Sequence, residues 1–241
     1  MIKSELLSHI NKYHLSGMVQ SVVWRIKDNM VQIKFLATEN SIAGELLFPF
    51  DSLDESADIG IFDTKALLGL INIMQEDITL EFTKEHSIWM KLNLTDGLYE
   101  GSYSLADIRS IPDAPDIDEP KTFEVSFALD KEFKDQYLKA YKALGSINRV
   151  TIQTLKKDIK FTLGNRESYA NKVSFNKSCD DFLPILPKSF SGEALAEILK
   201  NNPDLSESTL EISDKGLMKI SIYGAGGTDR VTYFLIELED V

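Results

Sequence analysis

The chain has 241 residues, a length that suits one large domain or two domains of about 120 residues each. Hydrophobic residues make up 43% of it and charged residues 27%, the usual mixture of a globular protein, which excludes a disordered, collagen-like or coiled-coil chain. Lysine and arginine total 26 against 38 acidic residues, so the net charge is -12 and any contact with nucleic acid requires a local cationic patch.

No apolar run approaches the roughly 18 residues that a membrane span requires, and residues 1–10 lack the basic and apolar pattern of a signal peptide. We therefore expect a soluble, cytoplasmic protein without a membrane segment. A single cysteine, Cys179, cannot form an internal disulfide, and with three scattered histidines it cannot build a closed zinc site. We expect neither a metal nor a cofactor.

The first half is predicted to begin with a helix over residues 3–12, with Ser4 as its N-cap. A second helix is predicted over residues 62–71. Alternation of apolar and polar residues predicts strands before and after this second helix. These strands lie at about 20–26, 31–37, 42–48, 79–82, 90–92 and 98–105.

A proline-rich and acidic stretch follows at residues 110–121, with three of the seven prolines and four acids. Proline removes backbone donors and biases the preceding residue toward extended geometry. The stretch therefore predicts an extended connector between two domains, at 1–110 and 122–241, with the connector at 111–121. A long surface loop inside one domain is the alternative.

The second half is predicted to contain an amphipathic helix over residues 131–144. Its apolar stripe has spacings of three and four, at Phe133, Tyr137, Ala140, Tyr141 and Leu144. Lys131, Lys139 and Lys142 fall on the opposite face, so one face packs and the other is cationic. A second helix is predicted over 190–199, and strands at about 149–155, 159–163, 173–175, 209–212, 218–220 and 230–238.

The two halves repeat each other. The helix over 62–71 has the apolar spacing of the helix over 190–199, and the strands at 90–92 and 218–220 show the same offset of 128 residues. Each half reads as a helix, several strands, a helix and three strands, which suits two helices on one face of an antiparallel sheet. The predicted fold class is α+β, in two similar tandem domains.

This order, spacing and repetition resemble the DNA polymerase sliding clamps, most closely those of T-even-type bacteriophages. The resemblance covers nearly the whole chain and is carried by residues 3–12, 61–71, 131–144 and 209–238. It implies a noncatalytic homotrimeric ring that encircles double-stranded DNA without reading its sequence and tethers the replicative DNA polymerase. It also implies loading by a clamp loader ATPase and, for a viral protein, residence in the cytoplasm of a bacterial host.

The resemblance implies a weakly cationic lining that contacts DNA phosphates. The candidates are Lys3, Lys12, Lys65, Lys131, Lys134, Lys139, Lys142, Arg149 and Lys200, with His9 and His14 near the first helix. Lys65 is balanced by Asp63, and Lys200 by Glu193 and Glu197, so their contribution is small. The alternative is that these cations only solvate helix surfaces, as most surface lysines do. Arg149, Lys156 and Lys157 lie around a predicted hairpin, where a solvated turn is expected, and Lys156 and Lys157 are left out of the candidates.

For ring closure, the resemblance implies pairing between edge strands of neighbouring subunits, at about 99–105 and 171–175. The candidate interface residues are Tyr99, Tyr103, Leu105, Val173 and Phe175. It also implies a docking pocket for partner proteins at the connector. That pocket is expected to be bordered by Ile108 and Ile111, with residues from the C-terminal strands.

Catalytic motifs are missing from the sequence: it has no phosphate-binding P-loop, no His-Glu-x-x-His and no Cys-x-x-Cys. The glycine-rich stretch at 224–227 lacks the third glycine of a dinucleotide fingerprint and predicts a hairpin turn. We therefore expect a noncatalytic protein. Two alternatives stay open, a small-molecule-binding protein or enzyme on a duplicated α+β scaffold and a phage structural protein that acts without DNA.

Overall fold

The computed structural model describes residues 1–145, 148–164, 170–179, 181–224 and 227–238. The chain forms two compact units. The first contains Met1–Pro115 and, among the described residues, 227–231; the second contains Asp116–Gly224 and the residues from Thr232 onward. Residues 225 and 226 of the predicted glycine-rich turn, and residues 239–241 of the predicted second domain, lie outside the described residues.

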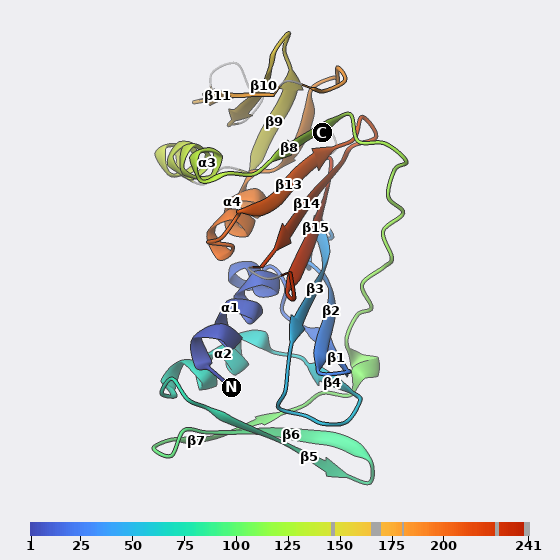
Figure 1. The fold of residues 1–241 in the computed structure, drawn as a ribbon, viewed down its shortest axis with the longest axis vertical. Coiled ribbons are helices and arrows are strands. Elements are labelled where there is room, and N and C mark those ends of the chain that lie inside the picture. Colours follow the sequence, from blue (N-terminus) through green and yellow to red (C-terminus); the bar gives the residue numbers. More distant parts are fainter. Residues whose placement is uncertain (146–147, 165–169, 180, 225–226, 239–241) are drawn as a thin grey trace. The chain divides into compact units, whose positions relative to one another are not determined.

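The first unit contains two helices and two sets of antiparallel strands (Figure 1). The strands pair in the orders β4-β1-β2-β3 and β5-β6-β7. Helix α1 contacts α2 and β3, and α2 contacts β7. The elements are α1 (Lys3–His14), β1 (Val22–Lys27), β2 (Met30–Leu36), β3 (Ile42–Pro49), β4 (Ala57–Ile61), α2 (Thr64–Ile73), β5 (Thr79–Glu85), β6 (Ile88–Thr95) and β7 (Glu100–Ser104), with short 3-10 turns at Leu15–Gly17 and Ile108–Ser110.

The second unit repeats this plan, with α3 against α4 and β11, and α4 against β9. Its strands pair in the orders β12-β9-β10-β11 and β8-β13-β14-β15, and the first two residues of β15 belong to the first unit. The elements are β8 (Val125–Ala128), α3 (Lys131–Leu144), β9 (Arg149–Thr154), β10 (Asp158–Leu163), β11 (Val173–Ser178), β12 (Lys188–Ser191), α4 (Gly192–Asn201), β13 (Glu207–Ile212), β14 (Leu217–Tyr223) and β15 (Arg230–Ile236).

The strand orders confirm the predicted duplication. The order β4-β1-β2-β3 corresponds to β12-β9-β10-β11, and β5-β6-β7 corresponds to β13-β14-β15. Helices α2 and α4 begin at Thr64 and Gly192, with the predicted offset of 128 residues. Helices α1 and α3 begin at Lys3 and Lys131 and have the same offset. The α+β class with two similar domains is therefore confirmed.

The hydrophobic cores follow from the alternation of each strand and the apolar stripe of each helix. In β2, Val31, Ile33 and Phe35 are buried while the residues between them are half-buried. Under α3, the ring of Phe133 contacts Phe161 and Phe175, with ring centroids 5.0 and 5.8 Å apart. Burial of each such side chain stabilises the fold by about 2 kcal/mol.

Three strands were not predicted, and one predicted helix cap was wrong. Strands β4, β8 and β12 are only four or five residues long, too short for a clear alternation. Helix α1 begins at Lys3 with Ile2 as its N-cap, so Ser4 is not the cap. The carboxylate of Glu76 instead accepts hydrogen bonds from the Ser4 hydroxyl and, at 3.2 Å, from the Ser4 backbone N–H.

Residues 111–124 contain no helix or strand, as expected for an extended connector. Each end is held by an ion pair to its own unit, Asp113 to Arg25 at 3.6 Å and Glu119 to Lys219 at 2.6 Å. The predicted boundaries at 1–110, 111–121 and 122–241 remain a prediction. None of the helices in the described residues has the length and hydrophobicity needed to cross a bilayer.

Candidate nucleic-acid interface

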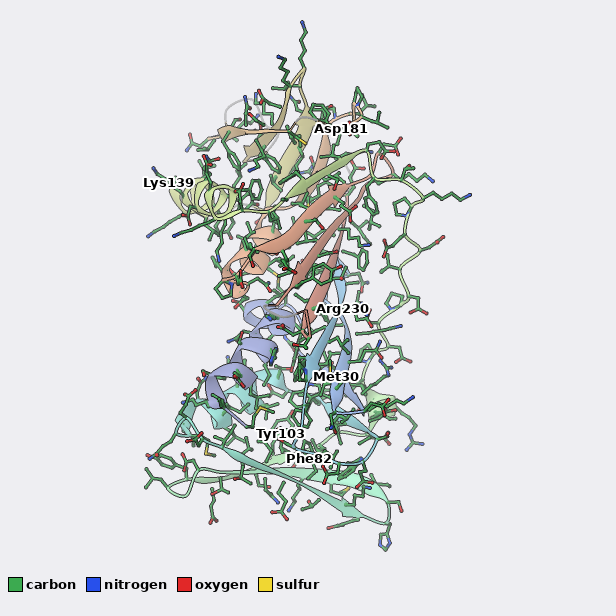
Figure 2. The ribbon with its side chains drawn as sticks, viewed as in Figure 1. Met30, Phe82, Tyr103, Lys139, Asp181 and Arg230 are labelled. Carbon is green, nitrogen blue, oxygen red and sulfur yellow. The ribbon has the colours of Figure 1, made fainter. Side chains whose placement is uncertain are left out.

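Helix α3 carries a row of exposed lysines. Lys131, Lys139 and Lys142 are all exposed, and no described residue forms an ion pair or hydrogen bond with their ammonium groups. Figure 2 labels Lys139 on this helix. The row from Lys131 to Lys142 extends about 16 Å at 1.5 Å per residue, a length over which duplex DNA presents several phosphates. Each ammonium group can therefore move its contact from one phosphate to the next without contacting the bases.

The start of α3 is fixed by its N-cap, Asp130. One carboxylate oxygen accepts a hydrogen bond from the backbone N–H of Phe133 at 2.7 Å, and the other pairs with Lys177. Partial burial opposes ionisation of Asp130, but the hydrogen bonds from Lys177 and Phe133 prevail and lower its pKa. On the other side of the helix, Phe133, Tyr137 and Ala140 are buried, which turns the lysine row toward solvent.

Two candidate lysines serve as caps of helix C-termini. The ammonium of Lys3, in α1, donates to the carbonyl oxygens of Asn72 and Met74 at 2.9 and 2.6 Å, where α2 ends. The ammonium of Lys134, in α3, donates to the carbonyl oxygen of Asn202 at 3.0 Å, where α4 ends. Both satisfy orphan carbonyls and the negative end of a helix dipole. Burial lowers the pKa of Lys134.

The remaining cations near α1 also lie within the fold. Lys12 forms an ion pair with Asp229 at 2.8 Å, and only 12% of the Lys12 side chain is exposed. The ring of His9 stacks on Phe48 with centroids 4.3 Å apart. Burial lowers the pKa of His9 to about 4, helped by the charge of Lys12, so His9 is neutral at pH 7. His14 is buried against the carbonyl oxygen of Val19, 2.7 Å from its Nδ1. Helix α1 therefore presents less cationic surface than α3.

The three other candidates differ in their surroundings. Lys65 is exposed near the start of α2, where the Asp63 carboxylate caps the helix by accepting from the Ala66 N–H at 2.9 Å. Lys200 pairs with Glu197 at 2.6 Å, as the balance of charges in the sequence suggests. Arg149 is half-buried and has a partner within the chain.

The candidate interface strands both lie at sheet edges. In the described residues, β7 pairs only with β6, and β11 only with β10. Tyr99 is 46% exposed, and Leu105 and Val173 are half-buried. Tyr103 is buried and its hydroxyl accepts from the Asp63 N–H at 2.9 Å, while Phe175 packs on the aromatic core below α3. These two side chains therefore pack within their own unit.

At the connector, the two predicted pocket residues have opposite surroundings. Ile108 is 42% exposed, whereas Ile111 is 6% exposed and packs against β4 beside Gly60. A side chain at Gly60 would collide with the carbonyl oxygen of Ala106, whose N–H donates to the Gly60 oxygen at 2.9 Å. Ile111 thus anchors the connector. Among the described residues, no group of three or more His, Cys, Asp or Glu side chains could hold a metal ion.

Comparison with known proteins relates this arrangement to solved structures. No protein-family model matches the chain, and no curated protein matches it. Proliferating cell nuclear antigen (PCNA) of A. fulgidus, in a structure with the C-terminal region of FEN-1, superposes with a TM-score of 0.76 at 17% identity, covering 100% of this chain and 98% of that one. The chain has the fold of the PCNA-type sliding clamps.

Two further PCNA structures agree with this assignment. PCNA from Entamoeba histolytica gives a TM-score of 0.70 at 14% identity, covering 99% of this chain and 96% of that chain. PCNA from Thermococcus kodakaraensis gives 0.69 at 16% identity, covering 98% and 97%. The expected clamp fold is therefore confirmed across the whole chain.

Proposed function

We propose that this protein is a noncatalytic sliding clamp that encircles duplex DNA and tethers a replicative DNA polymerase to its template. The observation that carries the proposal is the clamp fold over the full chain, with its exposed lysine row on α3. Lys131, Lys139 and Lys142 are the main proposed DNA contacts, and Lys65 is an additional one. Lys3, Lys12, Lys134, Arg149 and Lys200 have partners within the chain and are secondary candidates.

The charge distribution supports this role. A net charge of -12 makes the protein as a whole repel DNA, so attraction must come from local groups of cations such as the lysine row. Strong ionic binding would oppose sliding, because each phosphate contact adds to the affinity and must break as the protein moves. A closed ring retains DNA by enclosing it and needs only weak contacts.

The proposed ring is a homotrimer of chains with domains at 1–110 and 122–241 and the connector at 111–121. Its subunits would join through the edges of β7 and β11, near Tyr99, Leu105 and Val173, which would also cover two exposed sheet edges. We further propose that a clamp loader ATPase loads the ring onto DNA and that partner proteins dock at the connector near Ile108. The protein itself is proposed to be of the T-even phage type and to act in the cytoplasm of a bacterial host. The structure of A. fulgidus PCNA with a FEN-1 segment supports docking of partner peptides on this fold.

The experiment tests the ring and its topology together. Light scattering at micromolar concentration should give the mass of a trimer, and the protein should lengthen products of a cognate polymerase on a primed template with its loader. Protein loaded on nicked circular DNA should resist a high-salt wash and be lost after the circle is cut, because cutting opens an end. A strict monomer that never lengthens products, or equal retention on linear and circular DNA, contradicts the proposal.

A further inference from the structure

A groove lies on the face of β1, β2, β3 and β4 opposite the face that carries Trp24, Val31 and Ile33 into the core. The strand register brings its residues together in two rows. One row runs Asp58, Arg25, Gln32, Leu47 across four strands, and the next includes Lys27 and Met30. Arg230 completes the lining, and the cavity measures about 700 Å³. Figure 2 labels Met30 and Arg230.

The groove combines a cationic rim with apolar contacts. Arg25, Lys27 and Arg230 line it, and two of the chain's five arginines are thus gathered in one place in a protein of net charge -12. Met30 and Leu47 are half-buried and offer apolar surface beside them. Asp28 and Asp58 also line the cavity, so its charge is close to balanced. Such a site suits isolated carboxylates next to apolar side chains better than the continuous phosphates of a nucleic acid.

One carboxylate already occupies the rim. Asp113 of the connector lies 3.6 Å from the guanidinium of Arg25, with 88% of its own side chain and 39% of the Arg25 side chain exposed. An ion pair this exposed is worth less than about 1 kcal/mol. A bidentate carboxylate from another molecule can therefore displace Asp113, because guanidinium binds carboxylates through two parallel hydrogen bonds.

We propose that this groove, defined by Arg25, Lys27, Met30, Leu47 and Arg230, docks an extended segment of a partner protein in which acidic and apolar residues alternate. Arg25 and Arg230 bind its carboxylates, and Met30 and Leu47 contact its apolar side chains. Asp113 competes for Arg25 until the segment binds. The groove borders the connector at Asp113 and includes none of the lysines proposed to contact DNA.

The test uses the full-length protein and a labelled peptide of alternating glutamate and leucine, with fluorescence anisotropy as the readout. A matched peptide of alternating glutamine and leucine controls for apolar binding. We expect the glutamate peptide to bind, and the double variant Arg25→Glu and Arg230→Glu to lose at least about tenfold in affinity, the equivalent of about 1.4 kcal/mol. Asp113→Asn should strengthen binding a few-fold.

The matched control is Lys156→Glu with Lys157→Glu, which changes the net charge equally at the exposed turn between β9 and β10. It should bind the peptide like the wild type. Circular dichroism establishes folding, and Arg25→Ala with Arg230→Ala replaces the charge reversal if that variant unfolds.

Amide NMR shifts on peptide addition should map to residues 25–32, 47 and 58. Equal loss in both charge-reversal variants, no effect of Asp113→Asn, or shifts elsewhere would overturn the proposal. So would a duplex oligonucleotide that binds this groove more tightly than the peptide, or a change of oligomer mass caused by Arg25→Glu and Arg230→Glu alone. Because the peptide-binding readout uses no DNA and no polymerase, an absence of peptide binding would not contradict the proposed clamp function. Failure of the clamp experiment would likewise not contradict peptide binding in the groove.

Discussion

At the scale of single residues, the half-buried His9 shows how packing makes a candidate cation neutral at pH 7. Its ring stacks on Phe48, and its Nδ1 is buried without a hydrogen-bond partner among the described residues. Protonation would place an unpaired charge beside Lys12, and the nearby Asp229 offsets this only in part. The packing of His9 therefore stabilises α1 only while the ring is neutral.

This packing predicts a pH dependence of stability. The pKa of His9 is about 4 in the folded protein and 6.5 ordinarily, so the unfolded chain takes up its proton first as the pH falls. The stabilisation that depends on His9 is complete above pH 6.5 and declines between pH 6.5 and 4, by on the order of 3 kcal/mol. Urea unfolding of His9→Phe should show a smaller loss across this range than the wild type. His86→Asn, at an exposed turn, is the control. An identical dependence of the free energy of unfolding on pH in the wild type and His9→Phe would refute this explanation.

The cap of α3 gives a second residue-scale prediction. Asp130→Ala removes the acceptor of the Phe133 N–H and the partner of Lys177, so the free energy of unfolding should fall by about 1 kcal/mol. Asp135→Ala, at an exposed position within the same helix, should change it by less than about 0.5 kcal/mol. Urea denaturation measures both. Equal effects would mean that the cap contributes nothing specific.

At the scale of elements, α1 and α3 occupy equivalent places in the repeat but differ in charge. In α1, Lys3 is held by the C-terminal end of α2 and Lys12 by Asp229, whereas α3 exposes its lysine row. The two halves thus share a framework, and their surfaces diverge. We expect the DNA contacts of the second unit to outweigh those of the first.

Charge reversal on α3 tests this expectation. Lys139→Glu with Lys142→Glu should reduce loading or retention on circular DNA by roughly tenfold, because two phosphate contacts become repulsive. Assembly should be unchanged, since both side chains are exposed and have no partner among the described residues. Lys156→Glu with Lys157→Glu carries the same change of net charge and should retain DNA normally. If both variants are retained on DNA like the wild type, the α3 lysines only solvate the helix surface and do not contact DNA.

At the scale of the whole molecule, the proposed ring depends on contacts that a single chain cannot make. Tyr99→Glu places a charge on an exposed aromatic residue just before β7, so the trimer should dissociate at protein concentrations at least about tenfold higher than the wild type. Ile88→Glu, at a more exposed position in the neighbouring strand β6, should leave the mass unchanged. Sedimentation over a dilution series measures both. Dissociation by Ile88→Glu alone would place the interface elsewhere.

The sequence by itself determined the features that local pattern records. The apolar stripe of α3 is visible in the sequence because a period of 3.6 residues shows which side of a helix is apolar. The proline-rich connector is visible from its composition, and the 128-residue repeat from segments that match at a fixed offset. The same alternation predicted most strands to within a few residues. The short strands β4, β8 and β12 were missed because they contain too few residues to show a period.

Only the tertiary structure decided which charged and aromatic side chains are available to a partner. Lys12 meets Asp229 across 217 positions of sequence, and Lys134 reaches Asn202 across 68, so no local pattern distinguishes these lysines from the exposed ones. Tyr103 and Phe175 lie on edge strands, but their side chains turn inward. The groove at Arg25 and Arg230 likewise exists only where distant strands lie together, because contacts between remote residues depend on packing rather than on sequence period.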